Sequence, residues 1–79
     1  MKVYVVEAIY DVDYGDMYCQ ESINLGVYSS KEVAEKIARQ FLEIHNDVHH
    51  STEINVFELD GNKIESYEIE SDGKVIKNE

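Results

Sequence analysis

Hydrophobic and polar residues alternate with a period of two along most of the chain. This alternation is typical of β-strands, because successive side chains of a strand point to opposite faces of the sheet. It predicts strands at residues 2–10, from 17 or 18 to 27, 52–60, 63–70 and 74–77. Both faces of the first strand are apolar, which predicts a position in the interior of the sheet.

Residues from about 30 to 46 follow a different pattern, with apolar side chains three and four positions apart, as on one face of an α-helix. This predicted buried face comprises Val33, Ala34, Ile37, Ala38, Phe41, Leu42 and His45. Ser29 precedes Glu32 by three residues, which is the spacing of a capping box, and Tyr28 and Val33 have the spacing of a hydrophobic staple. We therefore expect Ser29 to cap this helix and Asn46 to lie near its end.

Turn-forming residues separate the predicted elements. Residues 60–62 and 71–73 are hairpin signals, and the polar stretch 11–16 predicts a turn or a long arm between the first two strands. The period slips between Val56 and Phe57, which permits a bulge or a strand covered on both faces. The order ββαββ(β) predicts an α+β two-layer sandwich, with one helix on one face of an antiparallel sheet of four or five strands. We expect the charged fourth and fifth strands to lie outermost.

The chain has 79 residues, which is the size of one domain spanning residues 1–79. Cys19 is the only cysteine, so an intrachain disulfide is excluded. The apolar run at the N-terminus is interrupted by Glu7 and is too short for a signal peptide. No stretch approaches the roughly 20 apolar residues of a membrane span. These features predict a cytoplasmic protein.

The net charge of −10 is unevenly distributed along the chain. Residues 1–28 carry a net charge of −4, residues 29–50 carry −1, and residues 51–79 carry −5. A field of this sign repels nucleic acid and anionic membranes, so we expect neither as a direct partner. It favours a protein partner with a basic surface. The alternative is that the charge serves solubility alone.

Three segments resemble a family of small bacterial and phage proteins of unknown function. They are Met1–Glu7 (MKVYVVE), Leu25–Ser30 (LGVYSS, followed by Glu32 and Ala34) and Val56–Asp60 (VFELD). The resemblance covers about the first 60 residues, and its motifs are structural, so it implies no catalytic residue. The acidic stretch around residues 11–21 and the charged C-terminal hairpin depart from the family pattern, and we expect any specialised function there.

Three histidines occur close together, because His45 and His49 are four residues apart and His50 follows. Imidazoles one helical turn apart can share a metal ion, with Asp47 between them. The predicted helix ends within this stretch, however, and histidines near a helix C-terminus are favoured by the helix dipole. We prefer the second interpretation and expect no metal site.

Residues 11–22 have the opening acids of a calcium loop but fail its other requirements. The sixth position is Asp16 instead of glycine, and the twelfth is Ser22 instead of glutamate. The chain also lacks the motifs of serine hydrolases and of phosphate-binding loops. We therefore predict no catalytic residues, no cofactor and no enzymatic activity.

Tyrosines and carboxylates alternate in the acidic stretch, and a second group of acids lies in the last hairpin. Tyrosine provides large contact area at low entropic cost, and carboxylates attract basic partners. The predicted partner-binding residues are Tyr10, Asp11, Asp13, Tyr14, Asp16, Tyr18, Glu65, Glu68, Glu70 and Asp72. The alternative is that these tyrosines shield sheet edges and that the carboxylates belong to a solvated loop.

These observations lead to one expected function and two alternatives. We expect a small acidic protein that inhibits another protein by occupying its basic surface. A phage-encoded anti-defence factor that mimics DNA, such as an anti-CRISPR or anti-restriction protein, would act on a nucleic-acid-binding host protein in this way. The first alternative is a structural or regulatory homo-oligomer, for example a homodimer, without an inhibitory role. The second is a metal-responsive binder that uses His45, His49 and His50.

Overall fold

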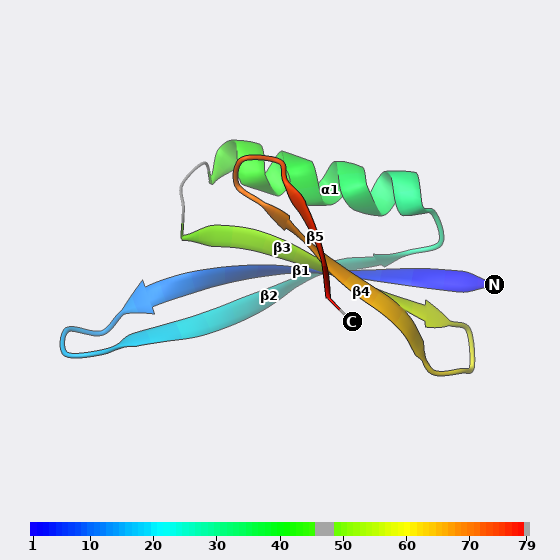
Figure 1. The fold of residues 1–79 in the computed structure, drawn as a ribbon, viewed down its shortest axis with the longest axis horizontal. Coiled ribbons are helices and arrows are strands. Elements are labelled where there is room, and N and C mark those ends of the chain that lie inside the picture. Colours follow the sequence, from blue (N-terminus) through cyan, green and yellow to red (C-terminus); the bar gives the residue numbers. More distant parts are fainter. Residues whose placement is uncertain (46–48, 79) are drawn as a thin grey trace.

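Five antiparallel strands form one sheet, and a single helix lies against one face of it in the computed structural model (Figure 1). The structure describes residues 1–45 and 49–78. The elements are β1 (Lys2–Asp13), β2 (Tyr18–Tyr28), α1 (Lys31–Ile44), β3 (His50–Glu58), β4 (Lys63–Glu70) and β5 (Val75–Asn78). The predicted two-layer α+β fold, with the order ββαββ(β), is confirmed.

The strands are arranged in the order β2-β1-β3-β4-β5. β1 pairs with β2 on one side and with β3 on the other, which confirms its predicted interior position. β5 lies at one edge of the sheet, as expected, and β2 forms the other edge. β4 lies between β3 and β5, in the interior of the sheet. The prediction that β4 is outermost was wrong, because its Tyr67 and Ile69 side chains are buried in the core despite the charges between them.

Helix α1 begins one residue later than the capping pattern predicts. Ser30 has extended backbone angles, and its Oγ accepts a hydrogen bond from the backbone N–H of Val33 at 3.4 Å. Ser30 is therefore the N-cap, and the capping box predicted for Ser29 and Glu32 does not form. Both serines suit the cap position, and the start at Ser30 turns Ala34 and Leu42 toward the sheet. The predicted end at Asn46 lies outside the described residues, where His45 is the last one before the gap.

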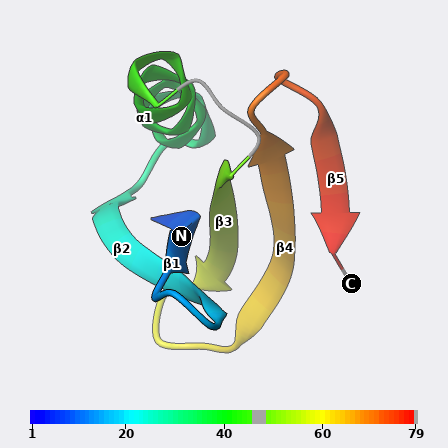
Figure 2. The ribbon, with the colours of Figure 1, turned by 90° about the vertical axis from the view of Figure 1, so that its left-hand side faces the viewer.

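The core lies between α1 and the covered face of the sheet (Figure 2). The helix contributes a narrow stripe in which Ala34 and Ala38 are fully buried and Leu42 is nearly so. The sheet contributes Val6, Ile54, Val56, Tyr67 and Ile69. Two predicted members of the buried helical face, Val33 and His45, are exposed. Ile37 and Phe41 are partly buried, so the buried stripe is narrower than the predicted one.

Two register shifts shape the sheet. One lies between Val56 and Phe57 and confirms the predicted bulge in β3. The other leaves Leu25 unpaired in β2, where it packs against the core. The next residue, Gly26, has φ +136°, and a Cβ there would lie 2.5 Å from the Tyr28 hydroxyl. That hydroxyl donates a hydrogen bond to the carbonyl of Leu25 at 2.9 Å, so glycine at this position makes room for the tyrosine that closes the bulge.

The hairpin of β1 and β2 extends well beyond the rest of the sheet (Figure 1). Pairing of β1 with β3 stops at Tyr10, opposite His50, whereas pairing with β2 continues to Asp13, opposite Tyr18. We call residues 11–21 the arm. Half of the predicted turn at 11–16 is therefore strand, and the connection comprises residues 14–17 only. The molecule reaches 43 Å along its longest axis, compared with 23 and 20 Å along the others.

Candidate functional site

The arm carries one sign of charge. Residues 11–21 contain four carboxylates, Asp11, Asp13, Asp16 and Glu21, and no lysine or arginine. All four side chains are exposed. Asp11 and Asp13 lie two positions apart on one face of β1, at a spacing of roughly 6.6 Å along the strand. The hairpin ladder therefore holds Asp11 and Asp13 together on one face, whereas Glu21 lies on the other face and Asp16 lies in the connection.

The predicted binding residues of the arm divide between its two faces. Tyr10 and Glu21 lie opposite each other in register, on the face that bears the buried Val6 and Ala8. Glu21 accepts hydrogen bonds from the hydroxyls of Tyr14, at 2.7 Å, and Tyr10, at 3.4 Å. The bond to Glu21 raises the pKa of the Tyr14 hydroxyl. This tyrosine therefore stays a hydrogen-bond donor at neutral pH, and the carboxylate of Glu21 is already engaged.

The opposite face of the arm combines carboxylates with a freely exposed tyrosine. Asp11 pairs with Gln20, and Asp13 pairs with Tyr18, so these side chains share the face of the sheet that no helix covers. Tyr18 is 73% exposed, and Met17 in the adjacent turn is 59% exposed. Asp13 accepts a hydrogen bond from the backbone N–H of Gly15 at 2.8 Å, and its side chain remains exposed beside Tyr18. Exposed tyrosines are enriched in protein-binding surfaces.

Rings gather where the arm leaves the covered part of the sheet. The rings of His45 and His50 stack at 5.0 Å, with Phe41 4.4 Å from His45 and Tyr10 6.0 Å from His50. The neighbouring His49 lies 3.6 Å from Asp11, between Nδ1 and Oδ2. The sequence draws attention to these histidines, but only the pairing of β1 with β3 brings Tyr10 to them. The cluster packs the base of the arm against the end of α1.

The metal site considered for the three histidines has no geometric counterpart in the described part of the chain. His45 is the residue that caps α1, and His49 and His50 lie beyond the undescribed residues 46–48. Among residues 1–45 and 49–78, no three His, Cys, Asp or Glu side chains converge in the manner of a metal site. Asp47, the fourth residue considered for this site, lies outside the described residues.

The second predicted acidic group does not form one surface. Glu65 lies toward the helix side, where its Oε2 is 3.3 Å from the Nζ of Lys77. Glu68 lies opposite Glu53 and Ile76, on the open face. Asp72 lies in the turn before β5, where its Oδ1 accepts a hydrogen bond from the Lys74 backbone N–H at 2.9 Å. In the sheet, β1 and β3 lie between β4 and β2, which is the edge strand of the arm. The structure thus brings the arm residues together and scatters those of the last hairpin.

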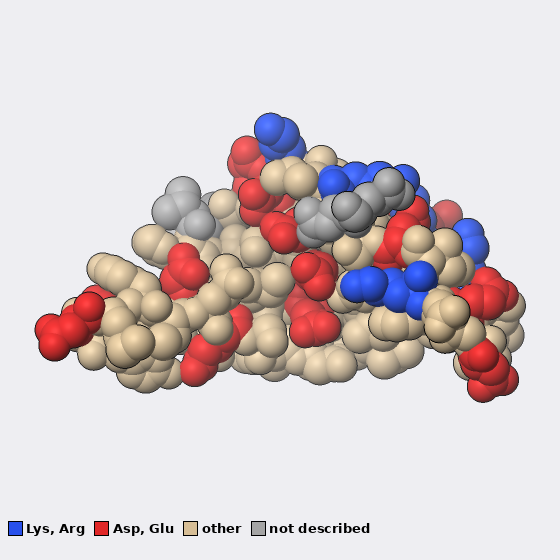
Figure 3. All heavy atoms as spheres, turned by 60° about the horizontal axis from the view of Figure 1, so that its bottom comes forward, with Lys and Arg blue, Asp and Glu red and all other residues tan. Residues whose placement is uncertain are grey.

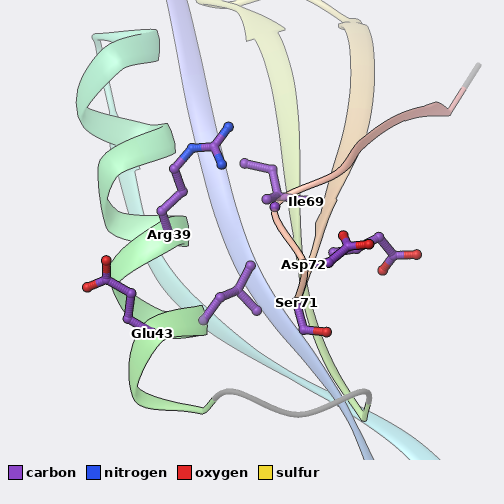
Figure 4. Close-up of a pocket in the computed structure, with 8 residues that line it drawn as sticks. Arg39, Glu43, Ile69, Ser71 and Asp72 are labelled. Carbon is purple, nitrogen blue, oxygen red and sulfur yellow. The ribbon is translucent and has the colours of Figure 1, made fainter.

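A small hollow of about 270 Å³ lies between α1 and the turn that joins β4 to β5 (Figure 4). Leu42 and Ile69 line it, and Arg39 extends from α1 toward Ile69, whereas Glu43 and Asp72 point away on either side. No histidine or cysteine is among the described residues that line the hollow. The hollow combines Arg39 with the apolar side chains of Leu42 and Ile69, and its other lining residues are Glu43, Glu70, Ser71, Asp72 and Gly73.

The distribution of charge distinguishes the arm from the rest of the molecule. In the face drawn in Figure 3, carboxylates occur at the arm end, in the middle and at the opposite end, whereas lysine and arginine gather away from the arm. No described helix has the length and apolar character needed to cross a membrane. The arm is thus a projecting segment whose charged side chains are all negative.

One comparison with known proteins places the chain in a family. No curated protein and no solved structure matches it. A family model described as "Domain of unknown function (DUF7336)" matches residues 1–75, which include every strand of the sheet at least in part, the helix and the whole arm. The chain therefore belongs to the family DUF7336, a domain of unknown function.

Proposed function

We propose that this domain is a cytoplasmic protein-binding module that inserts its acidic arm into a basic surface of another protein. The observation that carries the proposal is the arm itself. This projecting hairpin has three exposed carboxylates on its strands and a fourth in its connection, and residues 11–21 contain no lysine or arginine. A narrow projection with charge of one sign fits a groove lined by lysine and arginine, and its field steers such a partner toward it.

The tip of the arm supports contact by more than charge. Tyr14, Met17 and Tyr18 are each more than half exposed, although large apolar side chains are favoured inside proteins. A partner that covers them removes apolar area from water, and tyrosines of this kind frequently dominate the binding energy of an interface. In this proposal the negative charge raises the rate of association and orients the partner, and burial of the aromatic tip accounts for most of the affinity.

The most specific form of the proposal is inhibition of a nucleic-acid-binding protein. Basic grooves that accept a rod of regularly spaced negative charge are typical of proteins that bind phosphate backbones. The row of carboxylates on the arm takes the place of phosphates, and the arm competes with nucleic acid for the groove. A phage-encoded factor that blocks a host defence nuclease, including an anti-CRISPR or anti-restriction protein, would work by this mechanism.

The first experiment identifies a partner and then tests the role of charge. The chain is used to capture proteins from a bacterial lysate, and affinity for the purified partner is measured by calorimetry from about 50 to 500 mM salt. The arm variant combines Asp11→Asn, Asp13→Asn and Asp16→Asn. A matched control, also lacking three charges, combines Glu68→Gln, Glu70→Gln and Asp72→Asn.

We expect the arm variant to bind at least about tenfold more weakly and the control to change affinity by less than about threefold. Affinity of the wild-type chain falls steeply with salt, because exposed charges are screened over about 8 Å at physiological ionic strength. Nucleic acid added in excess displaces the wild-type chain from its partner. Equal losses in the two variants, or affinity that does not depend on salt, would refute recognition through the arm.

A homo-oligomeric role is the second candidate, and one observation favours it. β2 is an edge strand of eleven residues, long enough to pair with a second copy across a two-fold axis. Sedimentation equilibrium of the purified chain decides between the candidates. A concentration-independent monomer supports the arm as a heterologous binding site, whereas a stable dimer supports the oligomeric role.

A further inference from the structure

The two edges of the sheet differ in length and in protection. β5 has four residues and carries Lys77, with Lys74 immediately before it. β2 has eleven residues, contains no lysine or proline, and carries Glu21 as its only charged residue. Natural sheets protect exposed edges with short strands, charges, prolines or bulges, and the bulge of β2 lies only at Leu25. Residues 18–24 therefore form a regular strand edge on which the charge of Glu21 is the only one of these devices.

The hydrogen bonds around the arm establish which backbone groups of β2 face outward. The backbone N–H of Asp11 donates to the carbonyl of His49 at 3.2 Å, on the β3 side, so it points away from β2. At the tip, the N–H of Tyr14 donates to the carbonyl of Met17 at 2.9 Å, across the hairpin. Residues that face each other in an antiparallel pair alternate between exchanging hydrogen bonds and pointing away from each other.

The hydrogen bonds of Asp11 and Tyr14 agree on which residues of β2 point toward β1 and which point away from it. Gln20 is the register partner of Asp11, so its N–H and C=O point away from β1. The same holds for every second residue of the strand, at Tyr18, Ser22 and Asn24, whereas Cys19, Glu21 and Ile23 point toward β1. Four consecutive outward positions are enough to hydrogen-bond an added strand of about seven residues.

The charges around this edge indicate what kind of strand would be added. A strand beside β2 lies about 4.8 Å from it and about 10 Å from β1. On one face Glu21 borders the new strand directly, and on the other face Asp11 and Asp13 lie one strand further in, beyond Gln20 and Tyr18. An extended lysine or arginine side chain on the new strand spans β2 and reaches these carboxylates. A second copy of this chain, with the same net charge of −10, is repelled instead.

We propose that β2 receives an extended, lysine- or arginine-bearing segment of the partner as a sixth strand of the sheet. The inference rests on the proposed function, because it specifies how the basic partner is held. Main-chain hydrogen bonds to Tyr18, Gln20, Ser22 and Asn24 align the segment, and its basic side chains pair with the carboxylates of the arm. The interface therefore combines a sequence-independent backbone contact with selection for positive charge.

The test uses a defined probe and the full chain made by chemical synthesis. The probe is a ten-residue peptide with blocked ends in which lysine and valine alternate. Two further peptides serve as controls, one with glutamate in place of lysine, and one with proline in place of two central valines, which keeps the charge but prevents strand pairing. The protein variant carries a methyl group on the backbone nitrogen of Ser22, and Ser22→Ala is its control with an intact backbone.

We expect the lysine peptide to bind and to slow hydrogen exchange of the Gln20 and Ser22 amides at least about tenfold, as measured by NMR. Exchange at Cys19 and Glu21, whose amides already face β1, serves as the internal reference and reports that the hairpin is intact in each variant. Methylation at Ser22 weakens binding at least about tenfold, whereas Ser22→Ala changes affinity by less than about twofold. The proline peptide binds at least about tenfold more weakly than the lysine–valine peptide.

Three results would overturn strand addition. Salt-dependent binding that leaves exchange at Gln20 and Ser22 unchanged, or equal binding of the proline peptide, refutes the backbone contact but leaves recognition by charge intact. Equal binding of the glutamate peptide refutes the basic partner and, with it, the proposed function. Self-association of the chain that is abolished by methylation at Ser22 identifies a second copy as the occupant of the edge.

Discussion

The same two strands, β1 and β2, pass through two different environments. Beneath α1, the side chains of Val6 and Ala8 are completely buried. A few residues further along, in the arm, Tyr14 and Tyr18 are 56% and 73% exposed. The backbone pairing is continuous from one region to the other, apart from the bulge at Leu25. The two regions therefore differ in what covers them rather than in secondary structure.

This difference separates stability from recognition. The covered region contains the buried core, and its charges are few because burial of an unpaired charge is costly. The arm has no core of its own, so its residues are free to carry carboxylates and exposed tyrosines. Matched substitutions in the two regions should consequently have different effects, which the first two predictions below test. Two further predictions concern the covered region and the start of α1, and the four run from the largest expected effect to the smallest.

Removing an isoleucine side chain should affect stability in one region only. Ile54 is fully buried, so Ile54→Ala should lower the free energy of unfolding by about 2–5 kcal/mol. Ile23 is 48% exposed at the base of the arm, and Ile23→Ala should cost less than about 1 kcal/mol. Urea unfolding followed by circular dichroism measures both. Similar losses would mean that Ile23, which pairs with Ala8 next to the arm, belongs to the cooperative core.

Two tyrosines allow the same substitution in both regions. The hydroxyl of Tyr67, which is 5% exposed, donates to Oε2 of Glu35 at 2.9 Å and links β4 to α1. Tyr67→Phe should lower the free energy of unfolding by about 1–2 kcal/mol, because it leaves a half-buried carboxylate without its donor. Tyr14→Phe removes a comparable bond at an exposed site and should cost less than about 0.5 kcal/mol. Thermal unfolding at neutral pH provides the comparison, and a larger loss for Tyr14→Phe would contradict it.

Alkaline pH should destabilise the covered region through Tyr67. Burial, and then the hydrogen bond to Glu35, raises the pKa of this hydroxyl above its ordinary value near 10. The unfolded chain therefore loses this proton at lower pH than the folded chain, so the contribution is complete below pH 10 and is lost as the pH rises beyond it. The free energy of unfolding should fall by up to about 1.4 kcal/mol per pH unit from this group. Urea unfolding between pH 9 and 11 should show that the free energy of unfolding falls less steeply with pH in Tyr67→Phe than in the wild-type chain. Identical slopes in the two proteins would mean that Tyr67 is not the cause of the fall.

The two serines before α1 provide the smallest contrast. Ser30→Ala should lower the free energy of unfolding by about 0.5–1 kcal/mol, since its Oγ accepts a rather long hydrogen bond from Val33. Ser29→Ala should change it by no more than about 0.3 kcal/mol, because Ser29 is exposed and precedes the cap. Chemical denaturation of the two variants side by side measures the difference. An equal or larger effect at Ser29 would restore the predicted capping box.

The local pattern of hydrophobic and polar residues was sufficient to predict much of the fold. The alternation in residues 63–70 predicted β4 with the bounds that the structure shows, and the slip between Val56 and Phe57 predicted the bulge. The two apolar faces of β1 predicted its interior position. These features depend on neighbouring residues, because the direction of each side chain along a strand or helix follows from the backbone period.

The candidate site was predicted only in part. The structure places Asp13, Tyr14 and the other predicted residues of the arm in one hairpin, and their role in binding stays a prediction. The sequence did not predict that the two sides of this segment pair, because a polar stretch with a glycine is also typical of an unpaired loop. The acids of the last hairpin were grouped with them by charge, although Glu65 and Glu68 lie on opposite faces of the sheet. Charge along the sequence does not report which face or which neighbour a side chain has.

By itself, the sequence determined the type and approximate bounds of each element, the single helix that covers the sheet, and the excess of negative charge. Only the tertiary structure decided that β2 forms an edge, that Ser30 caps the helix, and that residues 11–21 form a paired ladder beyond the core. The physical reason is the range of the interactions. A period of two or of 3.6 is set within a few residues, whereas strand neighbours and edges depend on contacts between residues far apart in the chain.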